Sequence, residues 1–225
     1  MSHNAVRLVQ RAHAVLLDFD GPVTILMSPP ANARAADMAR VPLAGLDAPP
    51  DVAATTDHLA VLRWTGANAP DRLTEVEQAC IDAEIEAARV SDPTRGALDF
   101  LEACKHSDKP VVIVSNNAAG AVLTFLNRYD ATSLVRGIVG REPRRPDLLK
   151  PHPSLVLAAL DLVQVAAVDA VLIGDSVTDI EVAQVTGARA IGYAKSALRG
   201  RELTAAGADA VVSEMRSLWD TAAPE

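Results

Sequence analysis

The chain has little of several residue types, and each shortage narrows its function. Its 225 residues include two cysteines, seven aromatic residues and four lysines against 17 arginines. Two cysteines are too few for a disulfide framework, so we expect reduced thiols and a cytoplasmic location. The low aromatic content argues against a base-stacking platform, and the net charge of −8 argues against binding to nucleic acid.

Long apolar runs are absent as well. No run approaches the roughly 18 uninterrupted apolar residues of a membrane-spanning helix, so we expect no membrane segment. Residues 1–10 mix polar with apolar side chains, which is not the pattern of a secretory signal. With 49% hydrophobic and 22% charged residues, the chain can bury a full core. These limits leave enzymes and small-molecule binders, expected as a monomer or a small homo-oligomer.

Short apolar runs alternate with helical patterns along most of the chain. The runs predict strands at residues 14–17, 111–114, 137–139, 170–173, 188–191 and 209–212. Helical spacing predicts helices over residues 155–163 and 177–186, the second ended by Gly187. Continuous apolar strands separated by helices predict an α/β fold, a doubly wound parallel sheet covered on both faces.

The segment between the first two strands has a different composition. Five prolines divide residues 28–50 into short helical pieces. Thr74 and Glu77 then have the spacing of a capping box that opens a longer helix. We therefore predict an all-helical cap domain over residues 24–92, inserted into an α/β core domain of residues 1–23 and 93–225.

The most informative residues follow the first strand. Asp18 and Asp20 come directly after an apolar run and are followed by the Gly21-Pro22 break. In extended backbone, residues i and i+2 point to the same side, so both carboxylates can address one ligand. Ligands of open parallel sheets bind at the carboxyl ends of strands, where this pair falls. A simple acidic turn is the alternative, since Asp and Gly are common in turns.

Polar residues also follow the second strand and precede a later helix. Ser115, Asn116 and Asn117 end the run at 111–114, and Asn117 is also expected to cap the next helix. Lys150 lies between two leucines and a proline turn. The alternative is that Lys150 is a solvated loop residue, which is the more frequent environment of a single lysine.

A second acidic pair follows the strand at residues 170–173. Asp175 stands at the strand tip and Asp179 in the first turn of the next helix. Helix capping by Asp175 or Ser176 is the alternative role, although Asp near a helix start is favoured in any case. The strand ends together therefore carry two carboxylate pairs, a hydroxyl and an ammonium group. A phosphate dianion and a carboxylate nucleophile repel each other, so a divalent cation and a lysine must neutralise the charge between them. The combination is typical of phosphoryl transfer.

These motifs, in this order, resemble the haloacid dehalogenase superfamily, in its phosphatase branch with a helical cap after the first strand (phosphoglycolate-phosphatase-like). The matching motifs are Asp18-Phe19-Asp20-Gly21, Ser115-Asn116, Lys150-Pro151 and Gly174-Asp175-Ser176-Val177-Thr178-Asp179. The resemblance covers residues 14–22 and 95–213, while the cap matches only in length and helicity.

The resemblance implies a Mg²⁺-dependent enzyme that hydrolyses a small phosphorylated metabolite. Asp18 would be the nucleophile that becomes an aspartyl phosphate, and Asp20 would protonate the leaving alcohol and then activate water. Mg²⁺ would be held by the carboxylates of Asp18 and Asp175 and by the backbone carbonyl of Asp20, with Asp179 behind these ligands. Lys150 would also offset the charge of Asp18. The phosphoryl oxygens and the substrate would be contacted by Ser115, Asn116 and Lys150.

The resemblance leaves other activities open. Family members that cleave carbon–halogen bonds lack an Asp two residues after the nucleophile, so Asp20 favours phosphate ester hydrolysis. A sugar phosphomutase shares the same Asp pair, and a non-catalytic phospho-accepting or binding protein is the alternative from another class. Pro22 departs from the family pattern at the bend into the cap, which concerns the hinge and not the catalytic pair.

Within the cap, substrate choice is expected to rest on distinctive polar or aromatic residues. The candidates are His58, Arg63 and Trp64, although each residue type more often serves packing or the solvated surface. Cys80, on the apolar face of a cap helix, is expected to be an inert core thiol.

Overall fold

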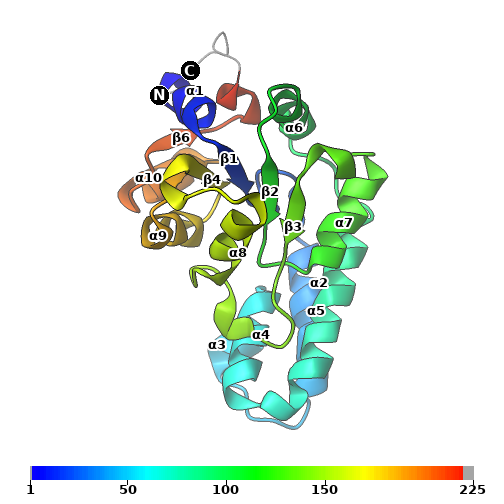
Figure 1. Cartoon of the computed structure of the whole chain (residues 1–225). Coiled ribbons are helices and arrows are strands. Elements are labelled where there is room, and N and C mark those ends of the chain that lie inside the picture. The colour runs from blue at the N-terminus through cyan, green and yellow to red at the C-terminus, as the bar shows by residue number, and fades with distance from the viewer. Residues whose placement is uncertain (1, 220–225) are drawn as a thin grey trace.

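The computed structural model describes residues 2–219 (Figure 1), so Met1 and residues 220–225 of the predicted core domain lie outside the described residues. The described chain contains a six-stranded sheet with the order β3-β2-β1-β4-β5-β6, in which every neighbouring pair is parallel. The strands are β1 (Ala14–Leu17), β2 (Val111–Val114), β3 (Gly137–Val139), β4 (Ala170–Gly174), β5 (Arg189–Tyr193) and β6 (Ala210–Val212). They coincide with the predicted runs to within two residues, which confirms the parallel sheet.

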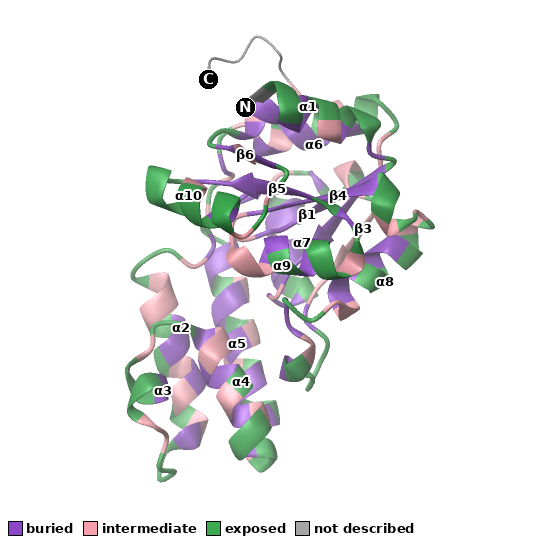
Figure 2. Ribbon diagram, turned by 90° about the vertical axis from the view of Figure 1, so that its left-hand side faces the viewer, coloured by how far each residue is buried: buried purple, intermediate pink, exposed green. Residues whose placement is uncertain are grey.

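Helices cover both faces of this sheet (Figure 2). One face packs against α1 (Ser2–Arg11), α6 (Ala97–His106) and α7 (Ala119–Arg128), and the other against α8 (Ser154–Val163), α9 (Val177–Thr186) and α10 (Ala197–Ala205). In the central strand, Val15 and Leu17 belong to the apolar cluster of the first face and Leu16 to that of the second. Because apolar side chains leave β1 in both directions, both faces need a cover. The fold is the predicted doubly wound sheet.

Between β1 and β2 the chain forms a helical unit at the end of the molecule away from α1 (Figure 1). Its α-helices are α2 (Ala31–Arg40), α3 (Pro50–Ala54), α4 (His58–Asn68) and α5 (Leu73–Ala88). They enclose their own apolar cluster, which includes Leu62, Val76 and Cys80. We call residues 24–92 the helical insertion. They cover the predicted cap, whose status as a separate domain stays a prediction.

The two ends of the insertion lie side by side. The Thr94 amide donates to the Val23 carbonyl at 2.8 Å, and the Thr94 hydroxyl donates to the Gly21 carbonyl at 2.7 Å. In the reverse direction, the Thr24 hydroxyl donates to the Asp92 carbonyl at 2.7 Å. The chain therefore leaves the core and returns to it at one place, directly after β1.

The predicted capping box at the start of α5 was wrong. The helix begins at Leu73, one residue before Thr74, and its first turn has no side-chain cap. Glu77 is buried instead, and its carboxylate accepts a hydrogen bond from the backbone amide of Arg144 at 2.8 Å. The Glu77 carboxylate thus binds the distant Arg144 amide and not, as the local pattern predicted, the start of its own helix.

Candidate active site

The carboxyl ends of β1, β2 and β4 meet beside the helical insertion and form a pocket of about 440 Å³. Because β1 lies between β2 and β4, the residues that follow these strands become neighbours despite their distance in sequence. The core lines the pocket with Asp18, Asp20, Ser115, Asn116, Lys150 and Asp175. Larger hollows of about 830 and 750 Å³ lie elsewhere, and neither brings two carboxylates together. Sequence and structure therefore indicate the same site.

Lys150 joins the two acidic pairs. Its ammonium group is buried and donates to Asp18 Oδ1 at 2.8 Å, to Asp179 Oδ1 at 2.6 Å and to the Val114 carbonyl at 3.0 Å. Burial alone lowers the pKa of a lysine, but the charges of Asp179 and Asp18 outweigh this effect and raise the pKa of Lys150 above its usual value. Its two carboxylate partners therefore favour the charged form of Lys150, and the residue is not a solvated loop lysine.

Asp179 serves both the helix and the site. Ser176 is the N-cap of α9, and its side chain forms a reciprocal capping box with Asp179 at the third helical position. The same carboxylate is fully buried and pairs with Lys150 through its other oxygen. Ser176 therefore caps the helix, as the alternative interpretation allowed, and Asp179 completes that cap while it also pairs with Lys150.

Three carboxylates, those of Asp18, Asp175 and Asp179, lie close enough for one oxygen of each to fall within 4.8 Å of the others. Burial raises the pKa of Asp18 well above its usual value, and repulsion from Asp179 and Asp175 adds to the effect while Lys150 opposes it. Burial likewise raises the pKa of Asp175. Hard oxygen ligands with surplus negative charge suit a divalent cation such as Mg²⁺. The residues present therefore fit a metal site.

Asp20 lies in the turn after β1 and lines the same pocket, but its carboxylate is not one of the three in this cluster. Its Oδ1 accepts a hydrogen bond from the Leu26 amide at 2.8 Å, and burial raises its pKa. The turn depends on Gly21, which has φ +123°, a value that side chains disfavour. A Cβ atom there would lie 2.4 Å from the Asp175 carboxyl group. Pro22 lies inside the same turn.

The segment after β2 is held by its own side chains. Ser115 is fully buried, and its hydroxyl accepts from the Asn117 amide at 3.1 Å. Asn116 Oδ1 accepts from the Lys150 amide at 2.7 Å, which ties this segment to the lysine. The prediction that Asn117 caps α7 was wrong, because the N-cap is Ala118 and the Asn117 side chain turns back toward Ser115.

The distinctive residues of the insertion have different environments. His58 is buried and lines the pocket, whereas Arg63 is exposed at its rim and donates to the Lys150 carbonyl at 3.4 Å. Trp64 packs against the apolar cluster of the insertion, as its alternative role implied. Cys80 lies within that cluster, which confirms its predicted core position, and burial raises its pKa to about 12. Its lack of reactivity stays a prediction.

Two features of the site were not predicted from the sequence. Lys195 follows β5 and pairs with Asp175 at 2.9 Å; its position after a strand, in a chain with four lysines, was the available signal. The second feature is a buried contact of His58 and Arg141 with Glu84. Its partners lie far apart in sequence, so no local pattern indicated it.

The fold and the pocket define an α/β protein whose strand ends place carboxylates and a lysine around one pocket. A family model described as haloacid dehalogenase-like hydrolase matches residues 56–193, more than half of the chain. The chain belongs to the haloacid dehalogenase-like hydrolase family. This membership confirms the predicted family and the hydrolase class of the enzyme. The matched range begins after Asp18 and Asp20, so the roles of these two residues rest on geometry and motif.

Individual relatives agree with this family. A phosphoglycolate phosphatase from Pseudomonas putida is 24% identical over an alignment of 205 residues, and the match covers 77% of this chain and 74% of the relative. Among solved structures, CbbY from Rhodobacter sphaeroides in complex with phosphate has a TM-score of 0.69 at 18% identity, covering 91% of this chain and 95% of that one. A predicted phosphoglycolate phosphatase from Haemophilus somnus has a TM-score of 0.66 at 17% identity, with the same coverage. At these identities the structural likeness shows the fold.

A membrane-spanning segment requires a helix that is both long and apolar. Among residues 2–219, none of the helices has the length and apolarity required to cross a bilayer.

Proposed function

We propose that this protein is a Mg²⁺-dependent phosphomonoesterase that hydrolyses a small phosphorylated metabolite through an aspartyl phosphate. The observation that carries the proposal is the position of Lys150, which bridges Asp18 and Asp179 beside Asp175 in the pocket. A carboxylate nucleophile needs positive charge beside it when a phosphate dianion approaches, and this arrangement provides it.

In the first half of the reaction, a carboxylate oxygen of Asp18 attacks phosphorus. The bond between phosphorus and the ester oxygen breaks, and Asp20 gives its proton to the departing alkoxide, which leaves as an alcohol. The raised pKa of Asp20, caused by its burial, supports this role because it keeps a proton available nearer to neutral pH. The Leu26 amide fixes the carboxyl group in place.

In the second half, the ionised Asp20 takes a proton from a water molecule whose oxygen attacks phosphorus. The bond between phosphorus and Asp18 breaks, so inorganic phosphate leaves and the carboxylate is restored. Lys150 and the Ser115 hydroxyl bind the phosphoryl oxygens. Asn116 holds the Lys150 backbone and is a further contact to phosphate or substrate.

Mg²⁺ would be held by the carboxylates of Asp18 and Asp175 and by the Asp20 carbonyl, with Asp179 behind them. When bound, it supplies positive charge that neutralises the phosphoryl group. A negative charge would otherwise remain, because the three clustered carboxylates of Asp18, Asp175 and Asp179 outnumber by one the ammonium groups that pair with them, Lys150 and Lys195.

The helical insertion acts in this proposal as a cap over the pocket, where it excludes water and selects the leaving group. The relative from Pseudomonas putida is named a phosphoglycolate phosphatase, so 2-phosphoglycolate is the first substrate to test. A cytoplasmic location and a monomeric or small homo-oligomeric state stay predictions.

The test is phosphate release from phenyl phosphate and from 2-phosphoglycolate, with Mg²⁺ and with a chelator. We expect Mg²⁺ to be required and Asp18→Asn to remove turnover, because an amide is no nucleophile here. Asp161→Asn, an exposed position on α8, is the matched control and should be as active as the wild type. Undiminished turnover by Asp18→Asn would remove Asp18 from the mechanism.

The same assay separates the proposal from a sugar phosphomutase. A mutase would require a bisphosphate activator and release little inorganic phosphate. Release that matches loss of the ester, without an activator, supports the phosphatase.

A further inference from the structure

A buried carboxylate connects the helical insertion to the core behind the pocket. Glu84 of α5 is fully buried. Its Oε1 lies 2.9 Å from His58 Nε2, within the insertion, and 2.7 Å from Arg141 Nη1, in the core. Its Oε2 accepts a hydrogen bond from the Ala118 amide at 2.7 Å. One side chain of the insertion therefore binds two separate parts of the core.

The core partners of Glu84 hold the segment that carries Ser115 and Asn116. Arg141 Nη1 donates to the Asn116 carbonyl at 2.9 Å, and the Arg141 amide donates to the Asn117 carbonyl at 2.9 Å. Residues 115–118, which we call segment 115–118, are therefore held at two points. Glu84 binds the Ala118 amide, and Arg141 binds the carbonyls of Asn116 and Asn117. The conformation of the segment that would bind phosphate thus depends on a residue of the insertion.

The third partner, His58, faces the pocket. It is the first residue of α4, is 4% exposed and lines the same cavity as Asp18 and Lys150. Since the Glu84 carboxylate only accepts, Nε2 carries the hydrogen and Nδ1 is the ring nitrogen that remains. Among residues 2–219, Nδ1 has no hydrogen-bond partner.

Stability alone does not account for this cluster of buried charges. Burial raises the pKa of a carboxyl group, yet the hydrogen bond from His58 and the charge of Arg141 hold the pKa of Glu84 below its usual value. Glu84 is therefore ionised while fully buried. A buried ion pair gains little over well-packed apolar residues, but it fixes the relative positions of its partners.

We propose that His58 determines specificity by contacting the leaving-group end of the ester, and that Glu84 is the positioning residue that couples this contact to segment 115–118. The inference rests on the proposed phosphatase activity and adds a substrate class to it. The preferred esters carry a hydroxyl group that can donate a hydrogen bond to Nδ1. A phenyl leaving group offers no such partner.

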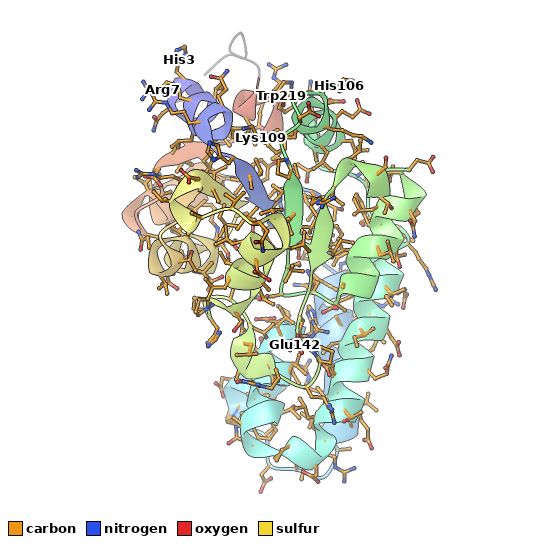
Figure 3. All side chains as sticks on the ribbon, in the orientation of Figure 1. His3, Arg7, His106, Lys109, Glu142 and Trp219 are labelled. Carbon is orange, nitrogen blue, oxygen red and sulfur yellow. The ribbon has the colours of Figure 1, made fainter. Side chains whose placement is uncertain are left out.

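The experiment compares kcat/KM for phenyl phosphate with kcat/KM for the best substrate among the monophosphates of glycolate, sugars, amino acids and nucleosides. His58→Phe keeps a ring but removes the polar contact. We expect the ratio of kcat/KM for the best ester to kcat/KM for phenyl phosphate to fall at least tenfold. The main cause should be a higher KM for the best ester. His106→Gln, on the exposed end of α6 (Figure 3), is the matched control and should keep the wild-type ratio.

A second pair of variants tests the coupling. Glu84→Gln should lower the same ratio and also raise the inhibition constant of inorganic phosphate at least fivefold, because segment 115–118 loses its anchor. Glu86→Gln lies on the same helix in an exposed pair with Arg34 and should change neither quantity. Circular dichroism checks folding, and if Glu84→Gln does not fold, His58→Phe decides the inference.

The possible failures are distinguishable. If the wild type hydrolyses none of the esters, the proposed function and this inference are both overturned. If the wild type is active but His58→Phe keeps the ratio within twofold, the inference alone is overturned.

Discussion

Lys150→Met tests whether the site is built around balanced buried charges. The substitution removes an ammonium group that bonds to Asp18 and Asp179, and it leaves an apolar side chain of similar length. Three clustered carboxylates then face each other, and among residues 2–219 the one ammonium group that still pairs with them is Lys195, on Asp175. Removing one member of a buried ion pair costs about 3–5 kcal/mol. For a chain of this size, that loss corresponds to a fall in Tm of roughly 6–20 °C.

The loss should depend on pH with a definite sign. Burial raises the pKa of Asp18 and Asp175, and the loss of Lys150 raises that of Asp18 further. A carboxyl group whose pKa is higher in the folded state binds more protons there, so stability falls as the pH rises from about 4 through the folded pKa. The Tm difference between variant and wild type should therefore be larger at pH 8 than at pH 5.

Mg²⁺ should restore part of the stability. A cation bound only by the folded state stabilises it by about 2.7 kcal/mol at one hundred times its dissociation constant. The assay is thermal unfolding of wild type, Lys150→Met and the exposed control Lys105→Met, at both pH values, with and without Mg²⁺. A stability loss in Lys150→Met that is equal at pH 5 and pH 8 and unaffected by Mg²⁺ would refute the charge argument.

Three further predictions concern other groups of the site and the core. Asp20→Asn should let the phosphoenzyme accumulate, because no base activates water; acid quenching after incubation with labelled ester measures it, and normal ester binding without any trapped phosphoenzyme would contradict the role. Lys195→Met should lower the Mg²⁺ concentration for half-maximal activity, because Lys195 competes with the cation for Asp175. The change should be only about two- to fivefold, because a partly exposed ion pair is weak. An increase would show that Lys195 does not compete with the cation. Cys80 and Cys104, whose pKa values burial raises to about 12, should resist iodoacetamide at pH 8 until urea unfolds the chain, as mass spectrometry can show.

The sheet and the core side of the site were predictable because their signals are local. Runs such as Val111–Val114 are too apolar to face water on either side, so they fix both the strand and its burial. Residues directly after such runs must lie at one edge of a parallel sheet. This rule predicts from the sequence that Asp18, Ser115 and Asp175 lie together.

The contacts between insertion and core were not predictable in the same way. Glu84 lies in a helix rich in Ala and Glu, where a carboxylate usually faces solvent. Its burial follows from the docking of α5 against α7, which brings Arg141 and the Ala118 amide to it. The errors at Thr74 and Asn117 have a related cause: each side chain was assigned to the nearest helix end, whereas tertiary packing decided the outcome.

The paired hydrogen bonds at Thr24 and Thr94 have a consequence for how this architecture can be altered. A segment whose entry and exit points are neighbours can be exchanged as a cassette, because the splice leaves the strand order and the acidic edge intact. A chimaera joined at residues 24 and 92 would present the same phosphate chemistry to a different set of leaving groups. Diversity of substrates can thus accumulate in this part of the chain while the sheet keeps its sequence.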